Sequence, residues 1–452
     1  MEGPSLSRET SQLVEYATDL RYEDIPQTVI QAAKNTICDG IGACLFGYRL
    51  PWSQIIYRYA EAIGAGGRSS VLGAGSAKLR PPLAALVNGA LAHSFELDGA
   101  LRPGVGAHPY ATIFPAALAV GQDNDNSGKQ LLTAFVAAAE VMIRIGRATM
   151  RSNERRGFHA PGTTGPFGAA IAAGLLRQLN FDGLSNAMGI AGSMSSGLLQ
   201  FSPAKKGGMV KRLHFGRAAE SGVMAASLAA DGFDGPHDIL EGKLGFLRAY
   251  CDEVDLRELT LNLGRSFLSE AIYMKRFACH GSAQNALQAL SAMQREHAIT
   301  ADDIESIRVT ATHELVERHG SREPTETAIA QYSVPFSVAL GCVRDARDPR
   351  AFDENALTDP RIREMLSRVR YVADDTLTDP TTSEVTVVLK SGAVHKRTVP
   401  EAPNSPSPRA NSAQVYEKYS ILTNDLPRAK MDEVFNRVQL LEEQANLGWL
   451  AV

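Results

Sequence analysis

Apolar residues over the first 265 positions recur at helical spacing, which predicts a mainly helical domain. The clearest stretch runs from Gly128 to Thr149, where apolar side chains stand at positions 131, 132, 135, 136, 139, 142 and 143. Another helix is expected to begin at Pro26, because proline is favoured in the first helical turn. Alternating patterns typical of strands are nearly missing from this part of the sequence, whereas small residues that let helices pack closely are frequent.

The pattern changes near residue 265, where strand-like alternation begins. Residues 304–310 alternate apolar and polar side chains, and residues 384–389 and 393–399 predict two strands joined by a short turn. Strands of this kind beside helical stretches are typical of a mixed α/β unit. We therefore expect an α/β domain over residues 266–404.

A proline-rich stretch ends this unit, and the helical pattern then returns. Four prolines between positions 400 and 408 predict a linker, and residues 412–446 are amphipathic at helical spacing. We expect these last helices to pack on the first domain, so that residues 1–265 and 405–452 form one helical domain. The expected fold class is mainly α, with a large helical domain that carries a smaller α/β lid domain as an insertion.

Length, composition and charge exclude several classes of protein. The 452 residues exceed what one hydrophobic core usually supports, and a 44% hydrophobic and 21% charged composition is that of an ordinary globular protein. The net charge of −4 balances 46 basic against 50 acidic side chains without a long run of one sign, so no nucleic-acid partner is expected. The sequence shows neither a secretion signal nor the roughly 20 apolar residues of a membrane span, which predicts a cytoplasmic protein that does not enter the membrane.

Motifs for metals and nucleotide cofactors are missing from the sequence. The five cysteines show no C-x-x-C spacing, and H-E-x-x-H is absent, which argues against a zinc site. The glycine-rich stretch 64–75 has the spacing of neither a dinucleotide loop nor a phosphate loop, and we interpret it as turns between helices.

Candidate site residues come from five short segments in which rare polar residues stand beside glycine or proline. In the first segment, an apolar helix leads to Glu96 and Asp98, and a loop then brings His108, which suits a buried acid/base site. Arg102 lies in the same segment and is a candidate for holding a substrate carboxylate, although an arginine there is more often a surface residue.

The second and third segments combine histidine with cations ahead of alanine-rich helices. Arg156 and His159 precede a glycine-threonine turn, whose backbone N–H groups can meet an anion at the start of a helix. Lys206, Lys211 and Arg212 can hold carboxylates, and Lys211 or Lys206 can act as a base if desolvation lowers its pKa. The fourth and fifth segments contain His280 and Tyr332. Taken singly, each such histidine is more often structural than catalytic.

The order of these motifs resembles the MmgE/PrpD family. The chain reads A-x-x-N-G-A-x-A-H, then H-P, G-F-H-x-x-G-T-x-G, K-R-L-H-x-G-R-A-A and K-R-F-x-x-H. The family includes 2-methylcitrate dehydratase, cis-aconitate decarboxylase and iminodisuccinate epimerase. The resemblance implies a homodimer with an inserted lid domain, an active site in the cleft between the domains and no metal or organic cofactor. It also implies a set of site residues, namely Glu96, Asp98, His108, His159, Lys211 and His280.

The chain departs from the family pattern at three places. Where the family usually has D-x-D-D-T, residues 96–100 read Glu-Leu-Asp-Gly-Ala, so that a carboxylate and a hydroxyl are lost. Phe336 replaces a tyrosine of decarboxylase-like members, which leaves Tyr332 as a replacement candidate. Gln284 stands where many members place a second histidine.

The chemistry shared by the family is proton movement on the carbon beside a carboxylate of a small di- or tricarboxylic acid. Cations such as Lys211 would stabilise the charge that forms, and a neutral imidazole would act as a base. The chain keeps the basic residues, but Gly99 and Ala100 stand where the family usually has an aspartate and a threonine. The sequence therefore favours an epimerase. A lyase, either a dehydratase or a decarboxylase, is the first alternative. A catalytically silent dimer that binds carboxylates is the second.

Overall fold

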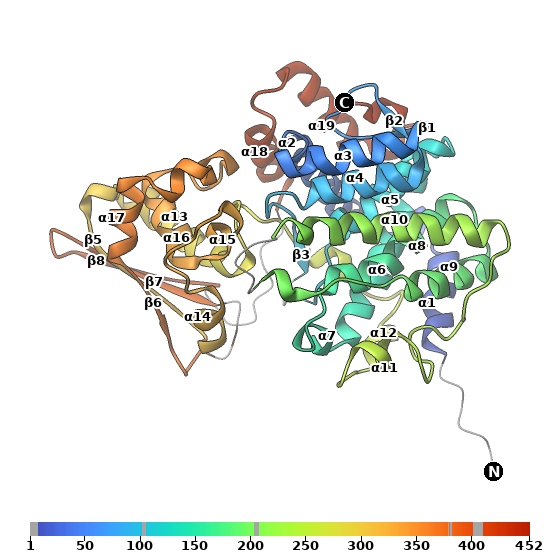
Figure 1. The fold of residues 1–452 in the computed structure, drawn as a ribbon, viewed down its shortest axis with the longest axis horizontal. Helices are drawn as coiled ribbons and strands as arrows, with labels where there is room; N and C mark the ends of the chain where they lie inside the picture. Colours follow the sequence, from blue (N-terminus) through green and yellow to red (C-terminus); the bar gives the residue numbers. More distant parts are fainter. Residues whose placement is uncertain (1–7, 102–104, 203–207, 378, 380–381, 401–409) are drawn as a thin grey trace, which may run out of the picture. The chain divides into compact units, whose positions relative to one another are not determined.

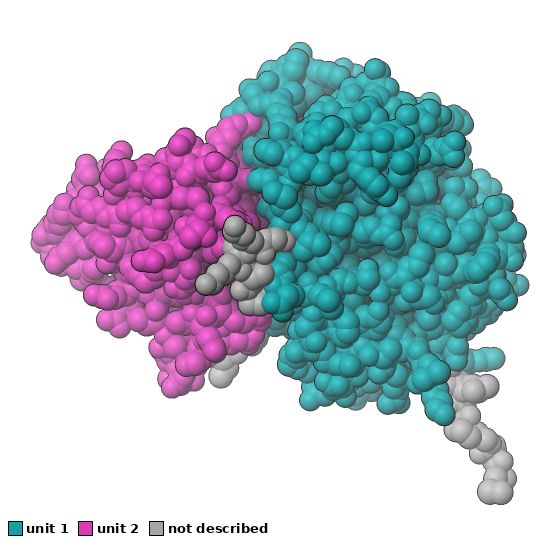
Figure 2. All heavy atoms as spheres, in the orientation of Figure 1, with its two compact units in different colours: residues 1–94, 98–274, 409–452 teal, residues 95–97, 275–408 magenta. Residues whose placement is uncertain are grey.

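A computed structural model describes residues 8–101, 105–202, 208–377, 379, 382–400 and 410–452. The chain divides into two compact units, which Figure 2 shows in different colours. Unit 1 comprises residues 1–94, 98–274 and 409–452, and unit 2 comprises residues 95–97 and 275–408. The sequence placed the corresponding boundaries at residues 265 and 405.

Unit 1 consists almost entirely of helices in its described part. They are α1 (Glu9–Asp19), α2 (Gln27–Gly47), α3 (Pro51–Gly64), α4 (Pro81–Ala92), α5 (Pro109–Asp123), α6 (Gly128–Ala148), α7 (Ser152–Arg155), α8 (Ala160–Leu176), α9 (Phe181–Ser193), α10 (Val210–Ala230), α11 (Phe246–Tyr250), α12 (Arg257–Thr260), α18 (Ser412–Leu422) and α19 (Arg428–Gln439). Two short antiparallel pairs join β1 (Ala65–Ser70) to β2 (Lys78–Leu79) and β3 (Ala100–Leu101) to β4 (Ile272–Tyr273).

The core of unit 1 is built around α10, which packs against α8 and α4 (Figure 1). Small residues make this packing close. A Cβ atom on Gly216 would lie 2.3 Å from the Leu86 carbonyl oxygen, and one on Gly222 would lie 2.3 Å from the Ala169 Cβ. Glycine at these positions therefore lets the backbones of neighbouring helices approach within a distance that no other residue permits.

Local signals explain where several helices of unit 1 begin. Pro26 caps the start of α2, as the proline pattern predicts. At the start of α6, Ser127 and Gln130 form a capping box, in which each side chain accepts a hydrogen bond from the other residue's backbone N–H. The segment expected to be a glycine-threonine turn, residues 162–165, is instead helical and lies in the first turns of α8. Its glycines serve close packing, since a Cβ on Gly162 would lie 2.2 Å from the Ser196 carbonyl oxygen.

Unit 2 contains a mixed sheet with helices packed against it. Its strands are β5 (Ile304–Ala311), β6 (Val369–Ala373), β7 (Ser383–Leu389) and β8 (Val394–Val399), in the order β6-β5-β7-β8. The β5–β6 pair is parallel, and the other two pairs are antiparallel. The helices are α13 (Gly281–His297), α14 (His313–His319), α15 (Thr327–Tyr332), α16 (Val334–Val343) and α17 (Pro360–Arg368).

This architecture confirms the expected fold class, a mainly helical chain with a smaller α/β part between its helical segments. The hairpin of β7 and β8 turns at residues 390–393, close to the position that the alternation predicts. Among the helices of the described residues, none combines the length and the apolar character that crossing a membrane would need. The homodimer and the cytoplasmic location stay predictions.

Candidate functional site

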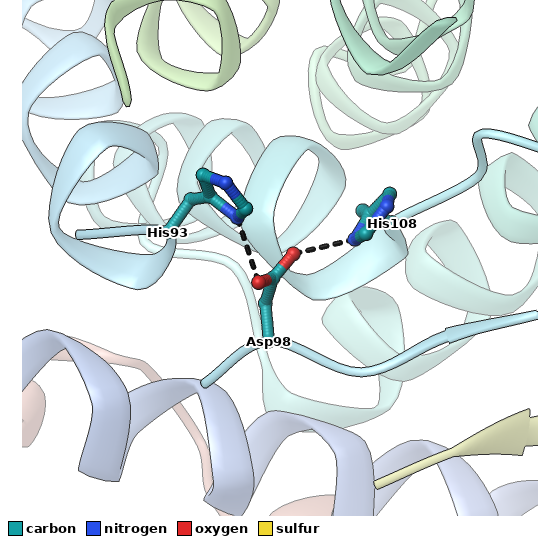
Figure 3. A group of neighbouring side chains, drawn as sticks. All are labelled: His93, Asp98 and His108. Atoms are coloured by element: carbon teal, nitrogen blue, oxygen red, sulfur yellow. Dashed lines mark hydrogen bonds and ion pairs between the residues drawn. The ribbon is translucent and has the colours of Figure 1, made fainter. Parts of the chain in front are cut away.

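Two histidines and one aspartate of unit 1 form a buried cluster (Figure 3). His93 follows the last residue of α4, and His108 precedes the first residue of α5. Asp98 lies between them, with its Oδ1 atom 2.7 Å from the His93 Nδ1 and its Oδ2 atom 2.5 Å from the His108 Nδ1. The Asp98 side chain is fully buried, whereas 17% of the His108 side chain is exposed. The ends of two helices thus bring two imidazoles to one carboxylate.

The chemistry of the carboxylate fixes the protons of this cluster. An ionised carboxylate accepts hydrogen bonds and cannot donate them, so each Nδ1 atom must carry the hydrogen. In the neutral form of His108, the Nε2 atom therefore has a lone pair available to accept a proton. This tautomer is the one that a general base needs.

The Phe215 ring of α10 lies among three histidine rings and is fully buried. It stacks on His93 with a centroid distance of 3.7 Å, and it meets the edges of His108 and His159 at 5.3 and 5.6 Å. The apolar ring restricts water around all three imidazoles. It thereby gathers residues that flank α4, α5 and α8 against α10 in one region of unit 1.

His159 and His214 form a second pair beside this ring. His159 precedes α8, His214 lies in α10, and their Nδ1 atoms are 3.0 Å apart. Burial lowers the pKa of His159 well below its usual value, and the positive charge of Lys211 lowers it further. Burial, together with His93 and Lys211, lowers the pKa of His214 to about 4. Both imidazoles are therefore neutral at pH 7.

Lys211 supplies positive charge on the same face of α10. It stands three residues before His214 and four before Phe215, which places the three side chains on one helix face. The residue is buried with 8% exposure, and its charge acts on both His159 and His214. The structure thus brings together four predicted site residues in unit 1, namely Asp98, His108, His159 and Lys211.

The predicted substrate-binding arginines of unit 1 contact main-chain oxygens. Arg212 is buried and donates hydrogen bonds to the carbonyls of Ser94 at 2.7 Å and Gly208 at 3.2 Å. The first of these bonds anchors α10 to the end of α4, directly beside His93. Arg156 is partly exposed and donates to the Ala249 carbonyl at 2.9 Å. The other two predicted cations, Arg102 and Lys206, lie outside the described residues.

Unit 2 contains Glu96, which forms a buried ion pair. Its Oε2 atom lies 3.1 Å from the Lys275 Nζ, and the two residues are 5% and 3% exposed. Glu96 has a φ of 57°, a left-handed conformation that is uncommon outside glycine. Gln331 holds this short segment in unit 2, because its amide donates to the carbonyls of Phe95 at 3.0 Å and Ala278 at 2.8 Å.

His280 of unit 2 lies in a stack of three rings at the start of α13. Its ring centroid is 4.5 Å from that of His319 and 4.6 Å from that of Tyr332, with interplanar angles of 26° and 29°. The His280 Nδ1 atom accepts a hydrogen bond from the Ser282 backbone N–H at 3.3 Å. Neutral His280 therefore carries its hydrogen on Nε2, which is the tautomer of a proton donor and the opposite of that in His108.

Gln284 organises the loop before His280. Its side-chain oxygen accepts from the Arg276 N–H at 3.0 Å, and its amide donates to the carbonyls of Phe277 at 2.8 Å and Cys279 at 3.0 Å. Phe336 is fully buried in α16. At these two positions the chain has a structural amide and an apolar ring.

Among the described residues, His93, Asp98 and His108 have the atom types of a metal-ligand set. Their ligand atoms lie within 4.8 Å of one another, and two imidazoles with one carboxylate suit Zn²⁺. Each Asp98 oxygen, however, already faces an imidazole Nδ1 at hydrogen-bond distance. Both Asp98 oxygens are therefore engaged by imidazoles, and the expectation of no metal stays a prediction.

Sequence reasoning assigned no role to three histidines and one lysine that the structure places at these sites. They are His93, His214, Lys275 and His319. The first three stand inside the quoted motifs, so their positions in the sequence could have identified them as site candidates. His319 lies outside every motif, and nothing in the sequence indicates its contact with His280.

Comparisons with known proteins agree with this arrangement of two parts. The family model for the MmgE/PrpD N-terminal domain matches residues 11–259, and that for the MmgE/PrpD C-terminal domain matches residues 277–443. The cis-aconitate decarboxylase-like protein oryM of Aspergillus oryzae is 29% identical over 376 residues, which cover 77% of each chain.

Two cis-aconitate decarboxylases are similar to the chain at comparable identity. That of Aspergillus terreus is 30% identical over 301 residues, which cover 64% of this chain and 60% of that enzyme. The match thus spans less than two thirds of the Aspergillus terreus enzyme. The human enzyme is 27% identical over 388 residues, which cover 83% of this chain and 79% of the human enzyme.

Proposed function

Because the chain belongs to the MmgE/PrpD family, we propose that it is a lyase that removes CO₂ from cis-aconitate or a similar unsaturated tricarboxylic acid. The curated relatives support this choice, since those named above are cis-aconitate decarboxylases or resemble them. These relatives favour the lyase alternative. The epimerase was favoured by the sequence because Gly99 and Ala100 are not polar.

The observation that carries the proposal is the cluster of imidazoles around Phe215, with Lys211 beside it. The histidines offer nitrogen atoms that can release or accept a proton, and Asp98 orients two of them. Lys211 offers a buried positive charge that can stabilise an anion. In a decarboxylation, a cation can stabilise the carbanion that forms, and a proton donor can then protonate it.

The C–C bond to one carboxylate breaks, CO₂ leaves, and the electron pair of the bond stays on the substrate as an allylic carbanion. Lys211 stabilises the remaining carboxylates and the delocalised negative charge. An imidazole then delivers a proton, which forms the new C–H bond and gives an unsaturated dicarboxylate. One proton is consumed for each CO₂ released.

Fewer structural observations support a catalytic or substrate-binding role for the other predicted residues. His280, with its hydrogen on Nε2, stays a catalytic candidate carried over from the family resemblance. Glu96 and Tyr332 stay substrate-binding candidates, and in the structure they contact Lys275 and His280 within unit 2. The main-chain contacts of Arg212 support a role in holding α10 against α4.

The experiment is to incubate the purified protein with cis-aconitate in D₂O and to follow the products by proton NMR together with CO₂ release. We expect CO₂ and an unsaturated dicarboxylate that carries one deuterium on carbon. His108→Ala and Lys211→Ala should abolish turnover without unfolding the chain. Recovery of deuterated substrate without CO₂ would support the epimerase instead.

A panel of polycarboxylic acids distinguishes an enzyme from a catalytically silent protein that only binds carboxylates. A thermal shift with citrate, cis-aconitate and succinate-derived acids measures binding without requiring turnover. Stabilisation by an acid that shows neither deuterium exchange nor CO₂ release would indicate a protein that binds carboxylates and does not transform them.

A further inference from the structure

The contact between His159 and His214 restricts where the two rings hold their hydrogens. Their Nδ1 atoms are 3.0 Å apart, which is hydrogen-bond distance. Such a bond forms when one nitrogen carries the hydrogen and the other has a lone pair. The tautomer of each neutral ring therefore determines that of the other, and moving the shared hydrogen changes both Nε2 atoms.

The surrounding backbone and rings hold this pair in place. The His159 backbone N–H donates to the Gly197 carbonyl at 3.0 Å, and the Phe201 ring lies 5.1 and 5.8 Å from the two imidazole centroids. Gly197 has a φ of 125°, and a Cβ atom there would lie 3.3 Å from the His214 ring. A larger residue at Gly197 would be strained and would crowd the imidazole.

The charges around the pair keep both rings neutral. Burial lowers the pKa of each ring, and the charged group that faces both is Lys211. His93 also acts on both rings, and His108 acts on His159 in the same direction. A neutral pair can pass a proton along without ever holding a stable positive charge.

We propose that His159 and His214 form a proton relay, in which His214 resupplies the proton that His159 delivers to the reacting carbon. The proposal rests on the proposed function, because decarboxylation consumes one proton in each turnover. His214 is then a positioning and proton-transfer residue, whereas His159 is the group that meets the substrate.

The difference in solvent exposure between the two rings sets the direction of proton transfer, from His214 to His159. His159 is 6% exposed and contacts the Phe201 and Phe215 rings, whereas His214 is only half-buried. Bulk protons therefore reach the His214 ring more readily than the His159 ring.

The transfer balances in protons and charge. Before it, His214 has its hydrogen on Nδ1, and His159 has its hydrogen on Nε2. A solvent proton adds to the His214 Nε2 while the Nδ1–H bond of His214 breaks and a new Nδ1–H bond forms on His159. The Nε2–H bond of His159 breaks as the new C–H bond forms on the carbanion. Both rings end neutral in the other tautomer. After the product has left, water donates a proton to the His159 Nε2, the shared hydrogen returns to the His214 Nδ1, and the His214 Nε2 releases its proton to solvent, which restores the first state.

The test compares variants at position 214 that keep or lose proton transfer. In His214→Asn, the amide can still donate or accept a hydrogen bond at the place of Nδ1, but it cannot take up a proton and pass on another. We expect kcat for CO₂ release to fall by about 10²-fold with little change in KM, within the range of acid/base effects. Imidazole added to the buffer should restore part of kcat. His237→Asn, which changes an exposed histidine of unit 1, is the matched control and should keep wild-type rates.

A second measurement reports on the pair without turnover. In ¹⁵N-histidine-labelled wild-type protein, an N–H···N hydrogen bond gives a scalar coupling between the two nitrogen nuclei, which His214→Asn should remove. A wild-type kcat in His214→Asn, or no coupling in the wild-type protein, overturns the relay. Failure of the wild-type protein to release CO₂ overturns the proposed function instead. His214→Gln provides a second variant if His214→Asn does not fold.

Discussion

The Oδ2 atom of Asp98 lies 2.5 Å from the Nδ1 atom of His108, and the same carboxylate meets His93 through its other oxygen. One negative charge thus orients two imidazoles that come from the ends of different helices. Since Asp98 is fully buried, the proton positions of this cluster depend on its carboxylate rather than on solvent.

Replacing Asp98 by asparagine should disable the cluster while leaving its shape intact. The amide of Asp98→Asn presents one oxygen and one NH₂ group, so one imidazole must accept on Nδ1 and carry its hydrogen on Nε2. We expect kcat to fall by about 10²- to 10⁴-fold, as when an imidazole that transfers protons is held in the wrong tautomer. Steady-state CO₂ release measures this loss, and Asp302→Asn, at an exposed position, should leave the rate unchanged.

Removing the cation of the buried pair in unit 2 should destabilise the chain. In Lys275→Met the Glu96 carboxylate loses its partner at 3.1 Å, and we expect a loss of about 3–5 kcal/mol in the free energy of unfolding. The double variant Glu96→Gln/Lys275→Met should regain part of this loss, because it leaves no buried charge. Urea unfolding measures both changes.

The exposed pair of Lys396 and Glu384 provides the control for this prediction. Lys396→Met should cost about 0–1 kcal/mol, since water screens that pair. Equal losses in Lys275→Met and Lys396→Met would show that the burial of the Glu96 pair has no energetic consequence.

The stack on His280 predicts that the ring of Tyr332 matters more than its hydroxyl. Tyr332→Phe keeps the ring that lies 4.6 Å from His280, so we expect near wild-type turnover. Tyr332→Ala removes a ring contact of about 0.5–1.5 kcal/mol and should lower kcat by up to about tenfold. If Tyr332→Phe loses as much activity as Tyr332→Ala, the hydroxyl takes part in the reaction.

Stability should fall as the pH drops from about 6.5 towards 4, because burial lowers the pKa of His159 and His214. In this range the unfolded chain binds protons at both histidines, whereas the folded chain does not, so acid favours unfolding. The melting temperature should therefore depend less on pH in His214→Asn than in the wild-type protein. An unchanged pH dependence in His214→Asn, with the exposed His237→Asn for comparison, would contradict this assignment.

The sequence predicted the fold because periodicity reports which face of an element is buried. The helical stretch at 128–149 and the strands around 304–310 and 384–399 appear where the patterns place them. Periodicity does not report which residues meet. The pair of His159 and His214 joins residues 55 positions apart, and its contact depends on how α8 packs on α10.

The glycines of α8 show why one local expectation was wrong. Gly162 and Gly165 resemble a turn in sequence, because glycine is common in turns. In the structure they are helical, and they are small because α8 approaches Ser196 and Ala218 closely. A single sequence does not separate these two reasons for a glycine, since both act through the missing side chain.

The three residues between Ser94 and Asp98 belong to unit 2, although both neighbours belong to unit 1. The same short peptide therefore carries His93 and Asp98 to one unit and Glu96 to the other. Adding or deleting one residue here would displace the carboxylate from its imidazoles or Glu96 from Lys275. We expect the length of this loop to tolerate less variation among functional homologues than its composition.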